Sequence, residues 1–248
     1  MTLEEAIELA NSGNVEAMRQ LGFYYFKDET GKIRDMKESL KYFEMGADRG
    51  DIGCTKLSII LLLMSARALR HVVGASGIDS VLRDLDKAWQ WNQRISSDAS
   101  DYEKNRISIL GEKGIAIYYR GTDSDDVNLI RQSVDILKEI MNDSTDSEVK
   151  LYLAFGINDL HHYKAYVSNA EYTLQFNLLT YCINKCPNLE RINIACAYLA
   201  GLYTFGLGTA VNYDMAVYYY QRATQNGFDC SDMLSHFKKN IFGKWQLK

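Results

Sequence analysis

The chain is 248 residues long, which is enough for one large domain or two small ones. Its 47% hydrophobic and 24% charged residues exclude a wholly disordered chain, which would need few apolar residues and a high net charge. A formal net charge of −4 gives no electrostatic reason to expect nucleic acid or an anionic membrane as a partner. The single proline favours long helices joined by short turns, because proline breaks helix interiors.

Cellular location is predicted from three further features. The first ten residues carry Glu4, Glu5 and Glu8, where a secretory signal would carry bases. The longest apolar run, from Leu57 to Met64, is too short to span a bilayer. The five cysteines have no regular spacing and are expected to be free, mostly buried thiols in a reducing compartment. We therefore expect a cytoplasmic protein without a membrane-inserted segment.

Paired helices are predicted along the whole chain. The expected helix hairpins span residues 3–50, 51–100, 101–146, 147–188 and 189–228, and a capping helix follows over 231–241. The expected turns lie at 28–31, 74–77, 120–123, 142–147 and after Pro187. No linker separates these segments, so a single repeat domain over residues 1–248 is predicted.

Two of the predicted hairpins, the first and the fifth, share a residue pattern. The paired positions are Ala17 with Ala195, Leu21 with Leu199, Gly22 with Ala200, Tyr25 with Tyr203, Ser39 with Ala216, Tyr42-Phe43 with Tyr219-Tyr220, Gly46 with Ala223 and Gly50 with Gly227. The small residue at Gly22 or Ala200 lets the second helix approach closely. Gly50 and Gly227 stand where the end of a helix favours a residue that tolerates positive φ.

This pattern resembles the Sel1-like repeat, a relative of the tetratricopeptide repeat with a longer, glycine-containing loop. The clearest copies are Leu199 to Gly208, and Leu21 to Tyr25 together with Gly46 to Gly50. The resemblance implies an all-α fold, a right-handed α-solenoid of about five antiparallel helix hairpins whose first helices line a concave groove. Members of the family act as adaptors and scaffolds, and some bacterial members serve in host interaction, signalling or toxin neutralisation. Secreted members carry a regular cysteine pair in each repeat, and this chain does not.

The repeat register predicts which side chains line that groove. The expected partner-binding residues are Glu16, Arg19, Phe23, Phe26, Glu112, Tyr119, Arg120, Leu151, Phe155, Asn158 and Phe205. Aromatic residues and arginine are enriched at the positions that dominate protein interfaces. For each single residue, packing between repeats is the alternative.

A metal site is the rival prediction. His161 and His162 lie on one predicted helix, and Cys182 and Cys186 lie one turn apart on its partner, so two cysteines and two histidines could surround zinc. Adjacent helical residues point about 100° apart, which disfavours both histidines reaching one ion. We therefore expect no metal and no cofactor.

No catalytic motif is present in the sequence: it contains no Gly-x-Ser-x-Gly, no phosphate-binding loop and no His-Glu-x-x-His. We therefore expect a non-catalytic module that binds a partner protein in its groove. The sharper hypothesis is a bacterial immunity protein that neutralises a cognate toxin, and the alternative is a cytoplasmic regulatory adaptor. A protein of another class, a metal protein or an enzyme, would use the His161, His162, Cys182 and Cys186 set.

Overall fold

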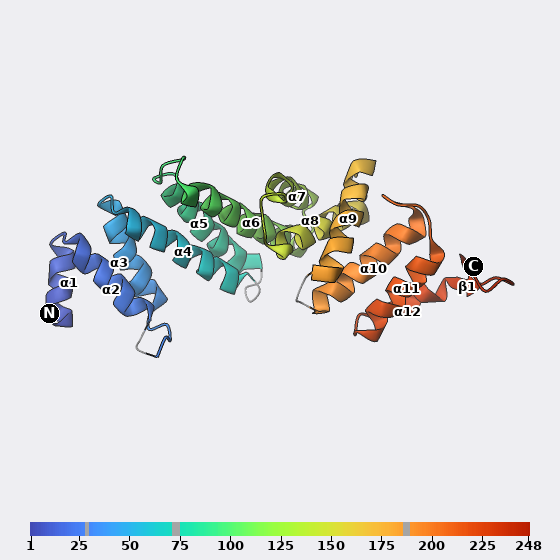
Figure 1. The fold of residues 1–248 in the computed structure, drawn as a ribbon, viewed down its shortest axis with the longest axis horizontal. Helices are drawn as coiled ribbons and strands as arrows, with labels where there is room; N and C mark the ends of the chain where they lie inside the picture. Colours follow the sequence, from blue (N-terminus) through green and yellow to red (C-terminus); the bar gives the residue numbers. More distant parts are fainter. Residues whose placement is uncertain (28–29, 71–74, 186–188) are drawn as a thin grey trace. The chain divides into compact units, whose positions relative to one another are not determined.

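The computed structural model describes residues 1–27, 30–70, 75–185 and 189–248. Within these ranges the chain forms helical hairpins, together with one short pair of strands at its end (Figure 1). The chain divides into two compact units, Met1–Tyr119 and Arg120–Lys248. The predicted all-α class and the hairpin repeat are thereby confirmed.

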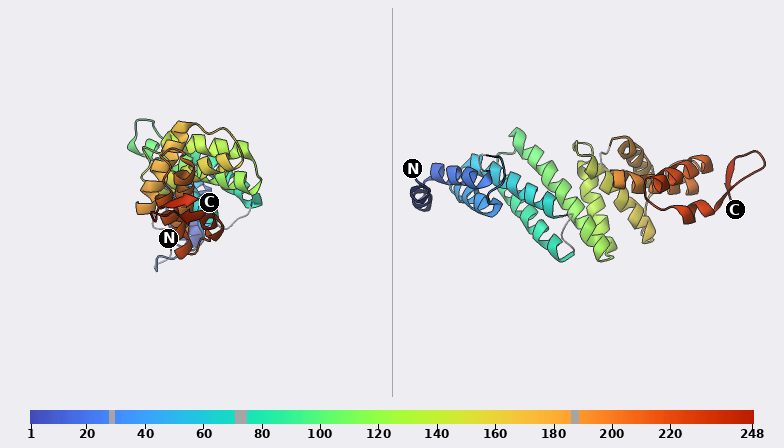
Figure 2. Two further views of the ribbon diagram at one scale, coloured as in Figure 1. Left: turned by 90° about the vertical axis from the view of Figure 1, so that its right-hand side faces the viewer. Right: turned by 90° about the horizontal axis from the view of Figure 1, so that it is seen from below.

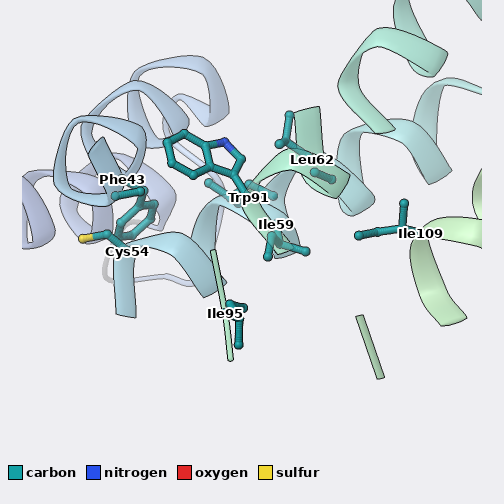
Figure 3. Packing of buried hydrophobic residues seen from close by; sticks show 10 residues of the cluster. Phe43, Cys54, Ile59, Leu62, Trp91, Ile95 and Ile109 are labelled. Atoms are coloured by element: carbon teal, nitrogen blue, oxygen red, sulfur yellow. The ribbon is translucent and has the colours of Figure 1, made fainter. Parts of the chain in front are cut away.

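Unit 1 contains six helices among its described residues, α6 crossing its boundary: α1 (Leu3–Asn11), α2 (Val15–Phe26), α3 (Met36–Asp48), α4 (Ile52–Leu69), α5 (Ala75–Asn92) and α6 (Ser100–Asp123). Consecutive helices pack on one another, α1 on α2, α2 on α3, α3 on α4 and α4 on α5 (Figure 2). A cluster of its core extends from α3 through α6 and includes Phe43, Ile59, Leu62, Trp91 and Ile109 (Figure 3). Each hairpin therefore buries its apolar face against its neighbour.

Unit 2 contains α7 (Val127–Ile140), α8 (Ser147–His162), α9 (Asn169–Lys185), α10 (Leu189–Phe205), α11 (Tyr213–Gln225), α12 (Ser231–Ser235), β1 (Phe237–Lys239) and β2 (Trp245–Leu247). α7 packs on α8, α8 on α9, α9 on α10 and α10 on α11. The antiparallel strands pair Phe237 with Leu247 and Lys239 with Trp245.

Helix starts are specified locally by short polar side chains. At six N-termini an aspartate or asparagine accepts hydrogen bonds from backbone N–H groups of the first turn: Asn14, Asp35, Asp51, Asp126, Asp146 and Asn212. Such caps satisfy donors that have no partner inside the helix, and they stabilise helices by about 1 kcal/mol each.

The matched hairpins α2–α3 and α10–α11 have the same internal geometry. Tyr25 stacks on Tyr42 with 5.7 Å between ring centroids, and Tyr203 stacks on Tyr219 at 6.0 Å. The carbonyls of Tyr25 and Tyr203 each accept a 2.9 Å hydrogen bond from the N–H of the residue that caps the second helix. The register inferred from the sequence therefore holds in space.

Three local predictions differ from the structure. Residues 120–123 belong to α6 rather than to a turn. Gly121 allows the close approach of α7, since an added Cβ would lie 2.9 Å from Ile130 Cγ1. Residues 75–77 open α5, and Gly74 lies outside the described residues. The predicted capping helix over 231–241 ends at Ser235. The side chain of Asn240 accepts hydrogen bonds from the N–H groups of Phe242 and Lys244 and closes a turn between β1 and β2.

α4 is, within the described ranges, the one helix that is long and apolar enough by length and composition to cross a membrane. In the structure it packs against α3 and α5, and Ile59, Leu61 and Leu62 are buried in the unit 1 core. The core therefore uses part of the apolar surface of α4, while Ile52, Ile60 and Met64 stay exposed.

Candidate functional site

The predicted groove residues of α2 form a partly exposed strip in unit 1. Glu16 is exposed and pairs with Arg19 at 2.9 Å. Phe23 is 48% exposed, and the edge of its ring meets the ring of Phe43 at 5.2 Å between centroids. Phe26 is half-buried against the unit 1 core. These four positions are therefore accessible in part, with an aromatic ring at the centre.

Arg19 also fixes α2 to the next hairpin. Its Nη2 lies 2.6 Å from Asp51 Oδ2, while Asp51 Oδ1 caps α4 by accepting from the Cys54 N–H at 2.6 Å. Burial raises the pKa of Asp51, but the hydrogen bonds from Cys54 and Arg19 outweigh it and hold that pKa below its usual value. Burial, with the nearby Asp51 carboxylate, raises the pKa of the Cys54 thiol to about 12. Cys54 is thus a protonated, buried thiol at neutral pH.

α4 adds exposed apolar residues that the sequence analysis missed. Ile60 is 47% exposed and Met64 is 38% exposed, and they lie four residues apart on one face of the helix. Because α4 is apolar nearly all round, its sequence periodicity does not show which apolar residues stay outside the core. Only the packing of α3 and α5 decides this.

Of two further residues predicted to line the groove, Glu112 is buried in unit 1 and Tyr119 is half-buried. Glu112 is buried and its carboxylate pairs with Arg67 at 2.7 Å and with the buried Arg70. Tyr119 packs against a cluster that contains Ala66. The reason for the burial of Glu112 is charge compensation, because a buried carboxylate needs a charged or hydrogen-bonding partner. Glu112 presents no free carboxylate to a partner.

The predicted residues in unit 2 divide between core and surface. Leu151 and Phe155 are buried, because α8 is enclosed by α7, α9 and α10. Phe155 packs edge-on against Tyr198, with 5.3 Å between ring centroids. Arg120 is exposed, and Phe205 is 67% exposed. Leu151 and Phe155 therefore present no side-chain surface to a partner, although Phe155 supports Tyr198.

Two predicted residues, Asn158 and Phe205, come together at a cavity of about 220 Å³ in unit 2. α8, α9, α10, α11 and the segments that follow α10 and α11 build it. Gly208 lets the turn after α10 approach α9 closely, since an added Cβ would lie 2.3 Å from the Tyr172 carbonyl oxygen. The cavity is lined by Asn158, His161, Tyr172, Gln175, Ala197, Tyr198, Gly201, Leu202, Phe205, Leu207, Tyr220, Phe228 and Met233.

Polar atoms occupy one part of the cavity wall. Gln175 is 1% exposed and its Nε2 donates to Asn158 Oδ1 at 3.5 Å, but its Oε1 has no hydrogen-bond partner among the described residues. His161 Nδ1 lies 2.7 Å from the Tyr172 hydroxyl. Burial raises the pKa of Tyr172, and burial with the nearby Asp159 raises that of Tyr198, so both phenols are neutral at pH 7.

The cavity arises from small residues at the positions that are large in the first hairpin. In the repeat register Ala197 corresponds to Arg19, and Gly201 corresponds to Phe23. Phe228, on the cavity wall, corresponds to Asp51, the ion-pair partner of Arg19. The Asp51 and Phe228 N–H groups donate to equivalent carbonyls, of Gly46 and Ala223, at 3.1 and 3.0 Å. One backbone frame therefore carries a charged, filled face in unit 1 and an apolar, hollow one in unit 2.

The residues of the alternative metal site have other contacts. Cys182 is buried and its thiol points to the Ser147 carbonyl at 3.8 Å, while His161 contacts Tyr172. Cys186 lies outside the described residues. Within the described ranges, no group of three or more His, Cys, Asp or Glu residues is placed to hold a metal ion.

These features define a protein built from helical-hairpin repeats with exposed aromatic residues on the first helices. The Sel1 repeat model matches residues 15–51, 74–96 and 193–228. The first match contains the α2–α3 hairpin, and the last covers the α10–α11 hairpin from residue 193 onward, the two hairpins that the sequence pattern pairs. The chain therefore carries Sel1 repeats, and the resemblance drawn from its sequence is confirmed.

Solved structures of the same repeat class are similar to the chain. A Sel1 repeat protein from Oxalobacter formigenes is 16% identical over 91% of this chain, with a TM-score of 0.46. A protective antigen with an SLR fold, present in uropathogenic Escherichia coli strains, is 16% identical over 95% of the chain, with a TM-score of 0.32. The chain spans 56% and 59% of the lengths of these two proteins. No curated protein matches the chain.

Proposed function

We propose that the chain is a non-catalytic module that binds a partner protein through the exposed residues of its first helices. The observation that carries this proposal is the exposure of Phe23 at 48% and Phe205 at 67%, each on the first helix of a Sel1-matched hairpin. Scattered exposed apolar residues are common on protein surfaces, but aromatic side chains on rigid helices are the residue type that dominates binding energy at interfaces. Sel1 repeats are commonly protein-interaction modules, which supports the same function.

We further propose one dedicated partner in the cytoplasm, such as a toxin neutralised by a bacterial immunity protein. The difference between the α2 face and the α10 face supports this, because a surface that recognised the same motif repeatedly would keep equivalent residues at equivalent positions. A regulatory adaptor that binds several proteins is the alternative. It would be favoured by capture of unrelated proteins on the same residues.

Site-specific photo-crosslinking tests the proposed function. Benzoylphenylalanine in place of Phe23 or of Phe205 should crosslink to the same protein in cells. Matched controls carry the crosslinker in place of Lys37 on α3 or Lys185 on α9, both exposed on second helices. Adducts at the controls without adducts at Phe23 and Phe205 would contradict the proposed face. No protein adduct at any of the four positions would contradict the function itself.

A further inference from the structure

We infer that the unit 2 cavity receives an aromatic side chain of the partner, one that carries a single uncharged N–H or O–H donor. This inference rests on the proposed function, since the side chain belongs to a partner protein. It adds a defined subsite and the chemistry of what enters it. Three features of the cavity support it: its size, the nature of its walls and the unpaired acceptor on Gln175.

The size of the cavity fits an aromatic ring system. An apolar protein cavity of about 150 Å³ is large enough to bind benzene. The unit 2 cavity, at about 220 Å³, exceeds that by about half and has room for a two-ring group such as indole. The cavity is partly open rather than closed, as a side chain that enters from a partner requires.

The walls of the cavity favour an aromatic occupant without charge. Tyr172, Tyr198, Phe205, Tyr220 and Phe228 supply ring edges and faces, against which another ring packs in edge-to-face or offset geometry. Among the described residues, the cavity wall contains no Asp, Glu, Lys or Arg. A lysine, arginine or carboxylate of the partner would therefore lose its hydration without gaining an ion pair.

Gln175 adds the requirement for a donor. Its Oε1 is buried and has no hydrogen-bond partner in the described part of the chain, although its Nε2 is engaged by Asn158. A buried acceptor without a partner is unfavourable, and a ligand that supplies an N–H or O–H removes this cost. Oε1 has almost no accessible surface as the side chain stands, so this hydrogen bond needs a rotation of the Gln175 amide toward the occupant. Leucine or phenylalanine would fill the space but leave the Gln175 carbonyl unpaired. The indole N–H of tryptophan, which only donates, meets both requirements.

Gly201 keeps the cavity open. A Cβ built on Gly201 meets only the Tyr220 hydroxyl, at 3.8 Å, so a side chain at this position would extend into the cavity without a clash at its base. Glycine in the interior of α10 lowers helix stability by about 1 kcal/mol relative to alanine. Packing does not require glycine at position 201, and glycine is unfavourable in the helix. Its presence there is explained if the cavity has to stay open for a ligand.

Ligand-observed NMR with indole and N-methylindole, added to the full chain, tests the inference. The two probes share the ring system, but only indole has an N–H. We expect indole to bind about tenfold more tightly than N-methylindole, because only indole pairs the Gln175 carbonyl. Equal affinity of the two probes would overturn the requirement for a donor, and no binding of either at millimolar concentration would overturn the cavity as a site.

Two variants locate the binding. Gln175→Met keeps the length of the side chain without the amide, and should reduce the tenfold preference for indole to about onefold. Gly201→Leu should weaken both probes more than tenfold by filling the cavity, and Gly201→Ala provides a smaller change if the leucine variant does not fold. Ala68→Leu, at an exposed position of α4, is the matched control and should bind both probes as the wild type does. Unchanged probe binding by Gly201→Leu would overturn the assignment to this cavity.

The outcomes separate this inference from the proposed function. If neither probe binds while Phe23 and Phe205 still crosslink to one protein, the cavity inference is wrong and the proposed function stands. If the probes bind as expected but no protein is crosslinked at any position, the proposed function is wrong, and with it the assignment of the cavity to a partner side chain.

Discussion

The first and last Sel1-matched hairpins show how one repeat frame carries two different surfaces. α2–α3 and α10–α11 share stacked tyrosines, capped second helices and a glycine with positive φ after the second helix. They differ where the first helix faces outward. Arg19, Phe23 and Asp51 occupy that face in unit 1, whereas Ala197, Gly201 and Phe228 surround a cavity in unit 2. The frame residues therefore determine the fold, and a few outward positions determine what each hairpin can bind.

The largest expected effect is the loss of partner affinity when an exposed phenylalanine of either hairpin is replaced. Phe23→Ala and Phe205→Ala should each weaken binding of the crosslinked partner by about 2 kcal/mol, or about thirtyfold in affinity, if each ring is an anchor of its own face. Lys37→Ala and Lys185→Ala are the controls and should change the affinity little. Titration calorimetry with the partner measures the affinity, and circular dichroism checks that the helices persist. A large effect of only one phenylalanine would show that only one hairpin contacts the partner.

Replacing Gly22 should lower the stability of unit 1, because Gly22 lies at a close contact between α2 and α3. An added Cβ at Gly22 would lie 2.5 Å from Cε1 of the buried Phe43 ring, so Gly22→Ala should destabilise unit 1 by about 1–3 kcal/mol. Denaturant unfolding measures the effect. Ala200, the residue that corresponds to Gly22, already carries a Cβ, so Ala200→Gly should lower stability by a smaller amount, about 1 kcal/mol. Unchanged stability of Gly22→Ala would mean that Phe43 moves freely.

Asp51 should stabilise α4 in a way that depends on pH. Asp51→Ala removes the helix cap and should lower the free energy of unfolding by about 1 kcal/mol at pH 7. Asp51→Asn keeps a capping oxygen but cannot titrate. Because the pKa of Asp51 is lowered in the folded state, its charge contributes stability above the unfolded-state pKa of about 3.9.

That contribution is lost as the pH falls through the folded-state pKa. The stability difference between wild type and Asp51→Asn should therefore be constant from pH 7 to about 5 and shrink below about 4. Urea unfolding at several pH values measures it. A difference that grows as the pH falls would contradict the ion pair with Arg19.

The smallest expected effect is a gain in stability. Gly201→Ala should raise the free energy of unfolding of unit 2 by up to about 1 kcal/mol, because alanine favours the helix and its Cβ meets only the Tyr220 hydroxyl at 3.8 Å. Thermal unfolding of the wild type and the variant measures the gain. A loss of stability would show that α10 needs glycine for packing, and it would remove one support of the cavity inference.

The sequence by itself determined the repeat frame of this protein. Leu21, Gly22 and Tyr25, and their counterparts Leu199, Ala200 and Tyr203, were sufficient for the hairpin pairing, because packing of two helices depends on side-chain size at fixed spacing. The caps at Asp35, Asp51 and Asn212 were local in the same sense, since they involve residues two to three positions apart. The Sel1 matches at residues 15–51 and 193–228 rest on the same spacing.

Only the tertiary structure decided which outward positions stay accessible. Leu151 and Phe155 are buried because a third helix, α10, covers α8, and no pattern within α8 reports that neighbour. Glu112 is buried because Arg67 and Arg70, more than forty positions away in the sequence, compensate its charge. The cavity at Gln175 depends on residues of α8 to α12 and of the turns after α10 and α11, and on what small side chains leave empty. Helical periodicity encodes contacts within three or four residues, whereas burial depends on the sum of long-range contacts, and this is why the frame was predictable and the site was not.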